Sequence, residues 1–132
     1  MGCMPEKQFY ITTTLPYVNA NPHIGFGLEI TEADVIARYQ QMTGKQVIFN
    51  TGTDEHGQKI YQKAKEKGID PQKYCGGYAA KFKQLSQLLN LNFTNFIRTT
   101  DSHHIEAAQK FWQKSKQNGD IYKAEYEVKY CV

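Results

Sequence analysis

Residues 9–50, FYITTTLPYVNANPHIGFGLEITEADVIARYQQMTGKQVIFN, decide the fold class that this sequence predicts. The first six, 9–14, are all β-branched or aromatic and predict a strand. Apolar residues then recur at near-helical spacing from Phe26, and the Thr-Gly pair at 43–44 predicts the end of that helix. The short apolar run at 46–50 predicts a second strand. A strand, a helix and a strand within 42 residues predict a parallel pair joined by a right-handed crossover.

The rest of the chain continues this alternation. The other predicted elements are a polar loop at 51–57, helices at 59–67, 71–89 and 103–117, a strand at 93–98, and one or two strands at 121–132. Pro71 is expected in the first turn of its helix, with Asp70 as the cap. We therefore predict an α/β fold, a Rossmann-like parallel sheet with flanking helices.

Composition narrows the class of protein without identifying it. The chain has 132 residues, a formal net charge of +3 and 40% hydrophobic residues, which is typical of a folded domain and argues against disorder. No run approaches the ~18 apolar residues that a membrane helix requires, so we expect no membrane partner. Three cysteines without a close pair favour a reducing compartment, and we expect a cytoplasmic protein. The oligomeric state stays open.

Two polar loops, at 14–25 and 52–57, are predicted to follow neighbouring strands. Ligands of open parallel sheets bind beyond the carboxyl ends of the strands. His23 precedes a helix whose N-terminal N–H groups attract anions, and Gly25 would let a flat base approach the backbone. Asp54 could hold an ammonium group. Phosphate at one loop and an amine at the other would suit the activation of an amino acid.

Each of these features also has a purely structural explanation. A histidine ahead of a helix is more often a cap or a surface residue, and Asp54 alone is most often a cap or turn former. Glu55 and His56 could simply be solvated, and Gly52 and Gly57 could serve only turn geometry. The combination of two such loops at adjacent strand ends is the stronger signal.

Residues 15–25, LPYVNANPHIG, followed by 51–57, TGTDEHG, resemble the N-terminal half of the catalytic domain of the methionyl-tRNA synthetases, a family of class I aminoacyl-tRNA synthetases. The similarity covers nearly the whole chain and extends through 96–101, 119–122 and 130–131. It implies that methionine and ATP, with Mg²⁺, react to give methionyl-adenylate and pyrophosphate. The methionyl group would then move to initiator or elongator methionine tRNA.

The resemblance also implies roles for single residues. His23 matches the first histidine of the family's His-Ile-Gly-His signature and would contact the triphosphate. Asp54 would hold the methionine ammonium group, and Tyr17 would form an aromatic wall of the methionine pocket. The implied sets are Pro22, His23, Gly25 and Glu29 for ATP, Thr14, Leu15, Tyr17 and Asp54 for methionine, and His23 with Phe26 as the catalytic positions.

Three departures from the family pattern matter. Phe26 stands where the signature has its second histidine, and a phenyl ring cannot donate to phosphate. Losing one such donor costs about 3 kcal/mol of transition-state stabilisation, so we expect a slower or differently arranged activation step. The family's Lys-Met-Ser-Lys-Ser loop is absent, and the similar 114–116 falls inside a predicted helix. Cys131 resembles the first ligand of a zinc knuckle, so zinc is expected only in a longer chain.

The predicted organisation is a flexible N-terminus at 1–8, the first half of the catalytic domain at 9–119, and the start of a truncated connective insertion at 120–132. Because the chain stops on a strand-like pattern, we expect an incomplete N-terminal fragment with weak activity or none by itself. Two alternatives stay open, another nucleotidyltransferase of this fold and a non-catalytic RNA-binding module. The spacing of the nine tyrosines favours core positions over an RNA surface.

Overall fold

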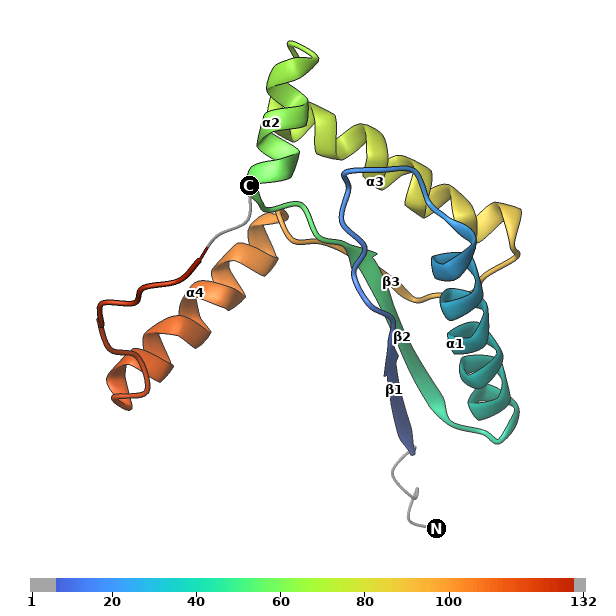
Figure 1. The fold of residues 1–132 in the computed structure, drawn as a ribbon. Helices are drawn as coiled ribbons and strands as arrows, with labels where there is room; N and C mark the ends of the chain where they lie inside the picture. Colours follow the sequence, from blue (N-terminus) through green and yellow to red (C-terminus); the bar gives the residue numbers. More distant parts are fainter. Residues whose placement is uncertain (1–6, 130–132) are drawn as a thin grey trace. The chain divides into compact units, whose positions relative to one another are not determined.

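The computed structural model describes residues 7–129, which divide into two compact units between Asp101 and Ser102. The first unit holds β1 (Gln8–Thr12), α1 (Ile24–Met42), β2 (Gln46–Thr53), α2 (Gln58–Glu66), α3 (Pro71–Leu88) and β3 (Asn95–Arg98). The second unit holds α4 (Ser102–Gln117) (Figure 1). The boundary that the sequence predicts between the catalytic domain and the connective insertion, at 119–120, stays a prediction.

The sheet is parallel, in the order β1-β2-β3, so β2 is central (Figure 1). Gln8 pairs with Gln46 in β2, and Asn50 in β2 pairs with Asn95. The chain passes through α1 between β1 and β2, and through α2 and α3 between β2 and β3. The predicted α/β fold with a parallel sheet is therefore confirmed, and the carboxyl ends of all three strands lie at one edge.

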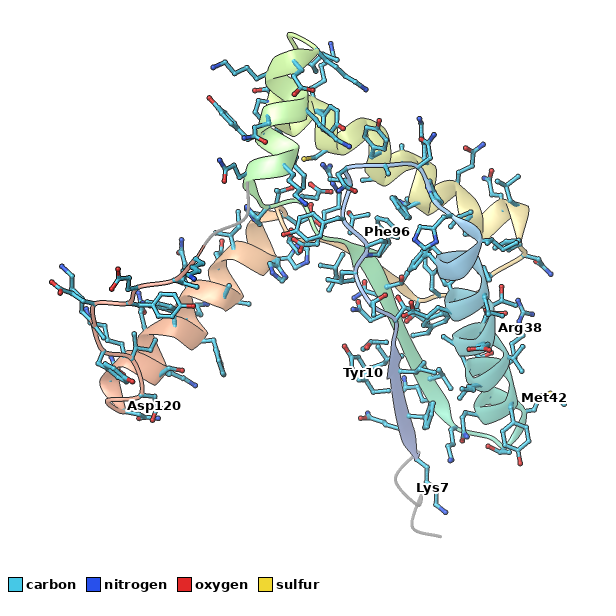
Figure 2. The ribbon with its side chains drawn as sticks, in the orientation of Figure 1. Lys7, Tyr10, Arg38, Met42, Phe96 and Asp120 are labelled. Carbon is cyan, nitrogen blue, oxygen red and sulfur yellow. The ribbon has the colours of Figure 1, made fainter. Side chains whose placement is uncertain are left out.

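The main core lies between α1, β2 and α3. Phe26, Ile30, Ala33 and Ala37 of α1 pack with Val47 and Phe49 of β2 and with Phe82 of α3. Burying each large apolar side chain contributes about 1.5–3 kcal/mol. Among the apolar residues whose spacing predicted α1, Leu28, Val35, Ile36 and Tyr39 are exposed instead. Tyr10 on β1 and Met42 at the end of α1 are exposed too (Figure 2).

A second buried cluster holds the loop that follows β1. Val18, from that loop, packs with Ile60 and Ala64 of α2 and with Tyr74 and Cys75 of α3. Lys63 Nζ also donates to the Asn19 carbonyl oxygen at 2.7 Å, and Lys81 Nζ to Asn21 Oδ1 at 2.9 Å. The loop is thus anchored from two helices.

Most helix ends follow the predicted signals. Gly44 and Gly68 lie just beyond α1 and α2 with φ of 79° and 62°, a region that favours glycine. The Asp70 carboxylate accepts a hydrogen bond from the Lys73 backbone N–H at 3.0 Å, which caps α3 as predicted.

Three sequence predictions need correction. The second strand continues to Thr53, because Gly52 lies against the Ile97 backbone of β3 rather than in a loop; a Cβ there would come within 1.9 Å of the Ile97 carbonyl oxygen. The flexible N-terminus predicted at 1–8 is too long, because Gln8 is the first residue of β1. Residues 1–6 lie outside the described part. Residues 120–129 form no strand, since isolated strands need a pairing partner. Tyr130, Cys131 and Val132 lie outside the described residues.

The tyrosines are mostly not core residues, contrary to the expectation from their spacing. Tyr74 is buried and Tyr78 partly so. The exposed ones are Tyr10, Tyr17, Tyr39, Tyr61, Tyr122 and Tyr126. Within residues 7–129, none of the helices is long and apolar enough to cross a membrane.

Candidate functional site

His23 stands immediately before α1 and caps it. Its backbone is extended (φ −118°, ψ 167°), and its Nδ1 accepts a hydrogen bond from the Phe26 backbone N–H at 3.3 Å. In a neutral imidazole, an accepting Nδ1 requires the proton to sit on Nε2. His23 therefore fills the structural role of a cap and still has an N–H donor available on its other nitrogen.

Gly25 makes room for this arrangement. A Cβ at residue 25 would lie 3.1 Å from both Cε1 and Nδ1 of His23, tighter than ordinary contact. A Cβ on Gly27, in the same helix, would meet nothing within 4 Å. The small residue at position 25 therefore lets the imidazole fold back over the first turn of α1.

A pocket of about 300 Å³ opens beside this helix end. It is lined by Thr14, Pro16, Tyr17, Asn19, Ala20, Asn21, His23, Gly25, Phe26, Glu29 and Phe82. The lining includes six residues predicted for the site from sequence: Thr14, Tyr17, His23, Gly25, Phe26 and Glu29. Leu15, Pro22 and Asp54 are outside the lining, although they adjoin it in the chain or through the backbone. The pocket is built from the loop after β1, the first turns of α1 and one side of α3.

Glu29 and Thr14 are joined across the pocket wall. The Thr14 backbone N–H donates to Glu29 Oε1 at 2.6 Å, and its hydroxyl donates to Oε2 at 2.8 Å. The Thr14 carbonyl oxygen accepts from the Thr13 hydroxyl at 2.8 Å. Glu29 thereby fixes the end of β1 relative to α1. The Thr14 backbone, expected to contact methionine, already has both its groups in internal hydrogen bonds.

Asp54 lies beside the same loop. Its backbone N–H donates to the Pro16 carbonyl oxygen at 3.0 Å, and its carbonyl accepts from the Val18 N–H at 3.3 Å. Tyr17 forms an isolated parallel bridge with it. The two strand-end loops therefore run side by side, as their placement at one sheet edge predicted. The Asp54 carboxylate is half-buried and accepts the His56 backbone N–H at 3.4 Å.

The Tyr17 ring sits over the second loop. A Cβ on Gly57 would lie 3.2 Å from Cε1 and from the hydroxyl of Tyr17, and Gly57 has a φ of 138°. A side chain at residue 57 would both strain the backbone and displace the ring. Gly57 is therefore required by the geometry of the turn, as the structural explanation proposed. It also leaves room for the Tyr17 ring, the aromatic wall of the pocket.

Phe26 is a core residue as well as a pocket residue. It is 4% exposed, and its ring meets the Phe82 ring edge-on, with centroids 5.5 Å apart at 78°. This packing of two aromatic rings stabilises the contact of α1 with α3. Phe26, the residue compared with the second signature histidine, therefore joins α1 to α3 through an apolar contact.

Glu55 is not solvated, so the interpretation of Glu55 as a solvated residue, which the sequence allowed, is wrong. Its side chain is 0% exposed and receives two hydrogen bonds from Arg98, from Nε at 2.7 Å and from an NH₂ group at 2.9 Å. Thr53 and Thr100 hydroxyls also donate to its carboxylate, at 2.9 and 2.6 Å. An arginine at the end of a predicted strand, opposite an acidic loop, was the available signal.

Opposing effects set the charge of Glu55. Burial raises the pKa of this carboxyl, but the hydrogen bonds from Arg98, Thr100 and Thr53 and the positive charge of Arg98 together lower the pKa below its ordinary 4.5. The same pairing raises the pKa of Arg98. Glu55 is therefore ionised at neutral pH and holds the backbone on either side of it in place. Its direct neighbours are Asp54 and His56.

No cluster of three or more His, Cys, Asp or Glu side chains that could hold a metal ion occurs within the described range, 7–129. Cys131, the residue compared with a zinc ligand, lies outside that range. Cys75 is buried, and its thiol donates weakly to the Glu55 carbonyl oxygen at 3.7 Å.

Residues 9–132 match a family described as tRNA synthetases class I (M). The chain is 50% identical over 125 residues to the methionine–tRNA ligase of Thermotoga maritima, covering 95% of this chain and 20% of that protein. It is 48% identical over 129 residues to the same enzyme of Clostridium tetani, covering 98% and 20%. The chain thus spans about a fifth of the length of these relatives.

A solved structure is similar throughout most of the chain. The methionyl-tRNA synthetase of Mycobacterium tuberculosis in complex with methionyl-adenylate superposes with a TM-score of 0.85 at 40% identity. The match covers 88% of this chain and 23% of that one.

Proposed function

This chain belongs to the class I tRNA synthetase family, and from that premise we propose that it forms the methionine- and ATP-binding part of a methionine–tRNA ligase. The methionine carboxylate would attack the ATP α-phosphate, giving methionyl-adenylate and releasing pyrophosphate. The methionyl group would then pass to the terminal adenosine of methionine tRNA. Catalysis of such a step relies on positioning and on stabilising phosphate charge.

The observation that carries the proposal is the pocket at the N-terminus of α1. His23 leaves its Nε2–H free there, beside the N-terminal N–H groups of α1 that its own cap does not use. Together they supply hydrogen-bond donors and partial positive charge for phosphate oxygens. Pro22 and Gly25 would border the ATP, and Glu29 would lie near its ribose. Phe26 adds no donor, which supports a slower or rearranged activation step.

The methionine would be held where the two loops meet. Asp54 has a carboxylate whose only described hydrogen-bond donor is the His56 backbone at 3.4 Å, so it is available to an ammonium group. Tyr17, paired with Asp54 through the backbone and 49% exposed, offers an aromatic wall for the thioether. Leu15 would complete the methionine side, and Thr14 would contribute through its carbonyl oxygen, which can accept a second hydrogen bond.

Several finer points belong to the same proposal. Initiator and elongator methionine tRNA are the proposed acceptors, and the cytoplasm is the proposed compartment. Mg²⁺ would accompany ATP, coordinated largely by phosphate oxygens and water. Zinc would bind only if Cys131 were joined by further ligands in a longer chain.

Methionine-dependent exchange of pyrophosphate into ATP tests the proposal, on this chain and on a version extended past Val132. We expect weak exchange or none from the short chain and stronger exchange from the longer one. Full activity of the short chain would contradict the claim that it holds only part of the site. A stabilising response to ATP with a phosphorylated alcohol, and none to methionine, would favour another nucleotidyltransferase.

Two variants separate ligand binding from structure. In the chain extended past Val132, His23→Asn retains a good helix cap but removes the Nε2 donor, so exchange should fall at least tenfold with little loss of stability. Asp54→Asn should raise the KM for methionine far more than the KM for ATP, because it removes the charge that faces the ammonium group. Unchanged kinetics in either variant would exclude the role proposed for that residue.

A further inference from the structure

The two helices α2 and α3 meet at a corner (Figure 1), and the stretch of chain that forms them has a net positive charge. Residues 58–88 contain seven lysines and two acidic residues, a net charge of +5, while the whole chain carries +3. The remaining residues therefore sum to −2. A charge asymmetry of this kind is typical of a surface that meets a polyanion.

Three of these lysines surround one pocket. Lys67, Lys73 and Lys81, with Ile69, Tyr74, Gly77 and Tyr78, line a pocket of about 270 Å³ on the surface of these helices. It is separate from the site described above, since the two pockets share no lining residue. Among the residues described, 7–129, the ion pairs involve only Arg38 and Arg98 as cations, so none of the three lysines is paired with a carboxylate.

Two of the ammonium groups are held in place by an aromatic ring. Lys67 Nζ lies 5.7 Å from the centroid of the Tyr78 ring and 3.5 Å from its hydroxyl. Lys81 Nζ lies 4.9 Å from the same centroid and donates to Asn21. Cation–π contacts of this kind fix a flexible lysine without neutralising it. The charges are therefore positioned in advance of any ligand.

A buried hydroxyl without a partner lines the same pocket. Tyr74 is 4% exposed, and within the described part of the chain its hydroxyl makes no hydrogen bond of ordinary geometry. The Tyr78 side chain lies beside it, with ring centroids 4.9 Å apart, and adds to the rise in its pKa. Burial above all raises the pKa of Tyr74 to about 12, so the hydroxyl keeps its proton at neutral pH and can donate. Unsatisfied buried polar groups are uncommon in folded proteins, and a ligand is one explanation for them.

The nearby acidic groups do not cancel this charge. Asp70 uses its carboxylate to cap the Lys73 N–H, and Glu66 is in α2 without an ion pair among the described residues. Lysine ammonium groups act as point charges toward phosphate. The three exposed lysines lie on α3 and just beyond α2, and charges spread along a surface in this way suit an extended phosphate backbone.

We propose that Lys67, Lys73, Lys81 and the Tyr74 hydroxyl form a contact site for backbone phosphates of RNA at the α2–α3 corner. This inference rests on the proposed function, in which an RNA is the second substrate. Lys81 also links the corner to the first pocket, because Asn21, its partner, lines that pocket. RNA held at the corner would thus adjoin the loop that carries His23.

Binding of fluorescently labelled tRNA, measured by anisotropy at several KCl concentrations, tests the site. The patch variant is Lys67→Gln, Lys73→Gln and Lys81→Gln together. The control variant is Lys110→Gln, Lys114→Gln and Lys116→Gln, which removes the same charge from exposed positions of α4. Far-ultraviolet circular dichroism checks that both variants remain folded.

We expect the patch variant to lose at least tenfold in affinity at low salt. Its plot of log affinity against log salt should be shallower by about 2, because each lost phosphate contact removes about 0.7–0.9 from the slope. The control variant should stay within threefold of the parent chain. Equal losses in the two variants, or no loss in the patch variant, would overturn the proposal.

A separate variant addresses the buried hydroxyl. Tyr74→Phe removes only the oxygen, so we expect RNA affinity to fall about threefold while thermal stability is unchanged or higher. Unchanged affinity would contradict the role of this hydroxyl.

Two further measurements separate the alternatives. Titration of inorganic phosphate, followed by NMR, would reveal a free-anion site. Saturable phosphate binding that the patch variant abolishes, with tRNA affinity intact, would overturn the RNA assignment. Methionine-dependent pyrophosphate exchange needs no tRNA. In the chain extended past Val132, it should be unchanged by Lys67→Gln with Lys73→Gln, which leave the Lys81–Asn21 contact of the pocket loop intact. Absence of exchange in the parent chain extended past Val132 would count against the proposed function and leave the RNA result standing.

Discussion

Arg98, at the end of β3, donates hydrogen bonds of 2.7 and 2.9 Å to the carboxylate of Glu55, which lies just beyond the end of β2. The Glu55 side chain is fully buried and that of Arg98 is 28% exposed. The pair joins two strand ends next to Asp54, so the acid proposed to bind methionine follows a strand whose end is fixed by an ion pair.

Replacing Arg98 by methionine should destabilise the fold by about 3 kcal/mol, because it leaves a buried carboxylate without its counter-charge. The comparison variant is Arg38→Met, which removes a 43% exposed arginine from Asp34. The Asp34 side chain is 8% exposed, but its carboxylate keeps the hydrogen bond from the Asn92 backbone N–H, so we expect a smaller loss, about 2 kcal/mol. Urea denaturation of both variants measures the difference. Equal losses would mean that the Glu55 carboxylate depends on its arginine no more than the Asp34 carboxylate does.

Stability should also depend on pH through Glu55. Because the pKa of Glu55 is lower in the folded chain than in the unfolded chain, its contribution is present above the unfolded value and is lost as pH falls through the folded value. We expect the free energy of unfolding to decrease as the pH falls below about 4.5, the ordinary pKa of a glutamate, and to go on decreasing until the folded carboxyl is protonated. The Glu55→Gln variant, less stable at neutral pH, should lose less over that interval. The same loss in both would assign the pH dependence to other carboxyls.

Gly25 and Gly27 form a natural pair for testing the histidine cap. In a helix, glycine is about 0.5–1 kcal/mol less favourable than alanine, so Gly27→Ala should stabilise by that amount. Gly25→Ala should give no such gain, because its Cβ would crowd the His23 ring at 3.1 Å and weaken the cap. Thermal unfolding compares them. A full gain at residue 25 would show that the imidazole moves aside freely.

Restoring the signature histidine, in Phe26→His, should not restore activity. The ring at this position packs edge-on against Phe82, and an imidazole there would lose that contact and bury a polar group. We expect a loss of about 2 kcal/mol and no gain in ATP affinity. Phe26→Leu, which keeps an apolar side chain, should cost less. Improved pyrophosphate exchange in Phe26→His would instead mean that the ring can turn toward the phosphate.

Much of the local structure around the site was predictable because its signals are local. The Asp70 cap, the glycines after α1 and α2, and the loops at the ends of the first two strands all depend on residues adjacent in the chain. The burial of Glu55 was not predictable in this way. Its partner, Arg98, is 43 residues further along and meets it only because β3 pairs with β2.

The amino-acid order by itself determined the strand–helix–strand alternation, the parallel pairing and the family, because periodicity, caps and a contiguous motif are properties of neighbouring residues. Tertiary structure decided the rest. It extended β2 through Gly52, where only a residue without Cβ can lie against the Ile97 backbone, and it turned Phe26 toward Phe82. It also left residues 120–129 without a strand, since their alternating pattern finds no partner among the described residues. Such outcomes depend on which surfaces meet in space.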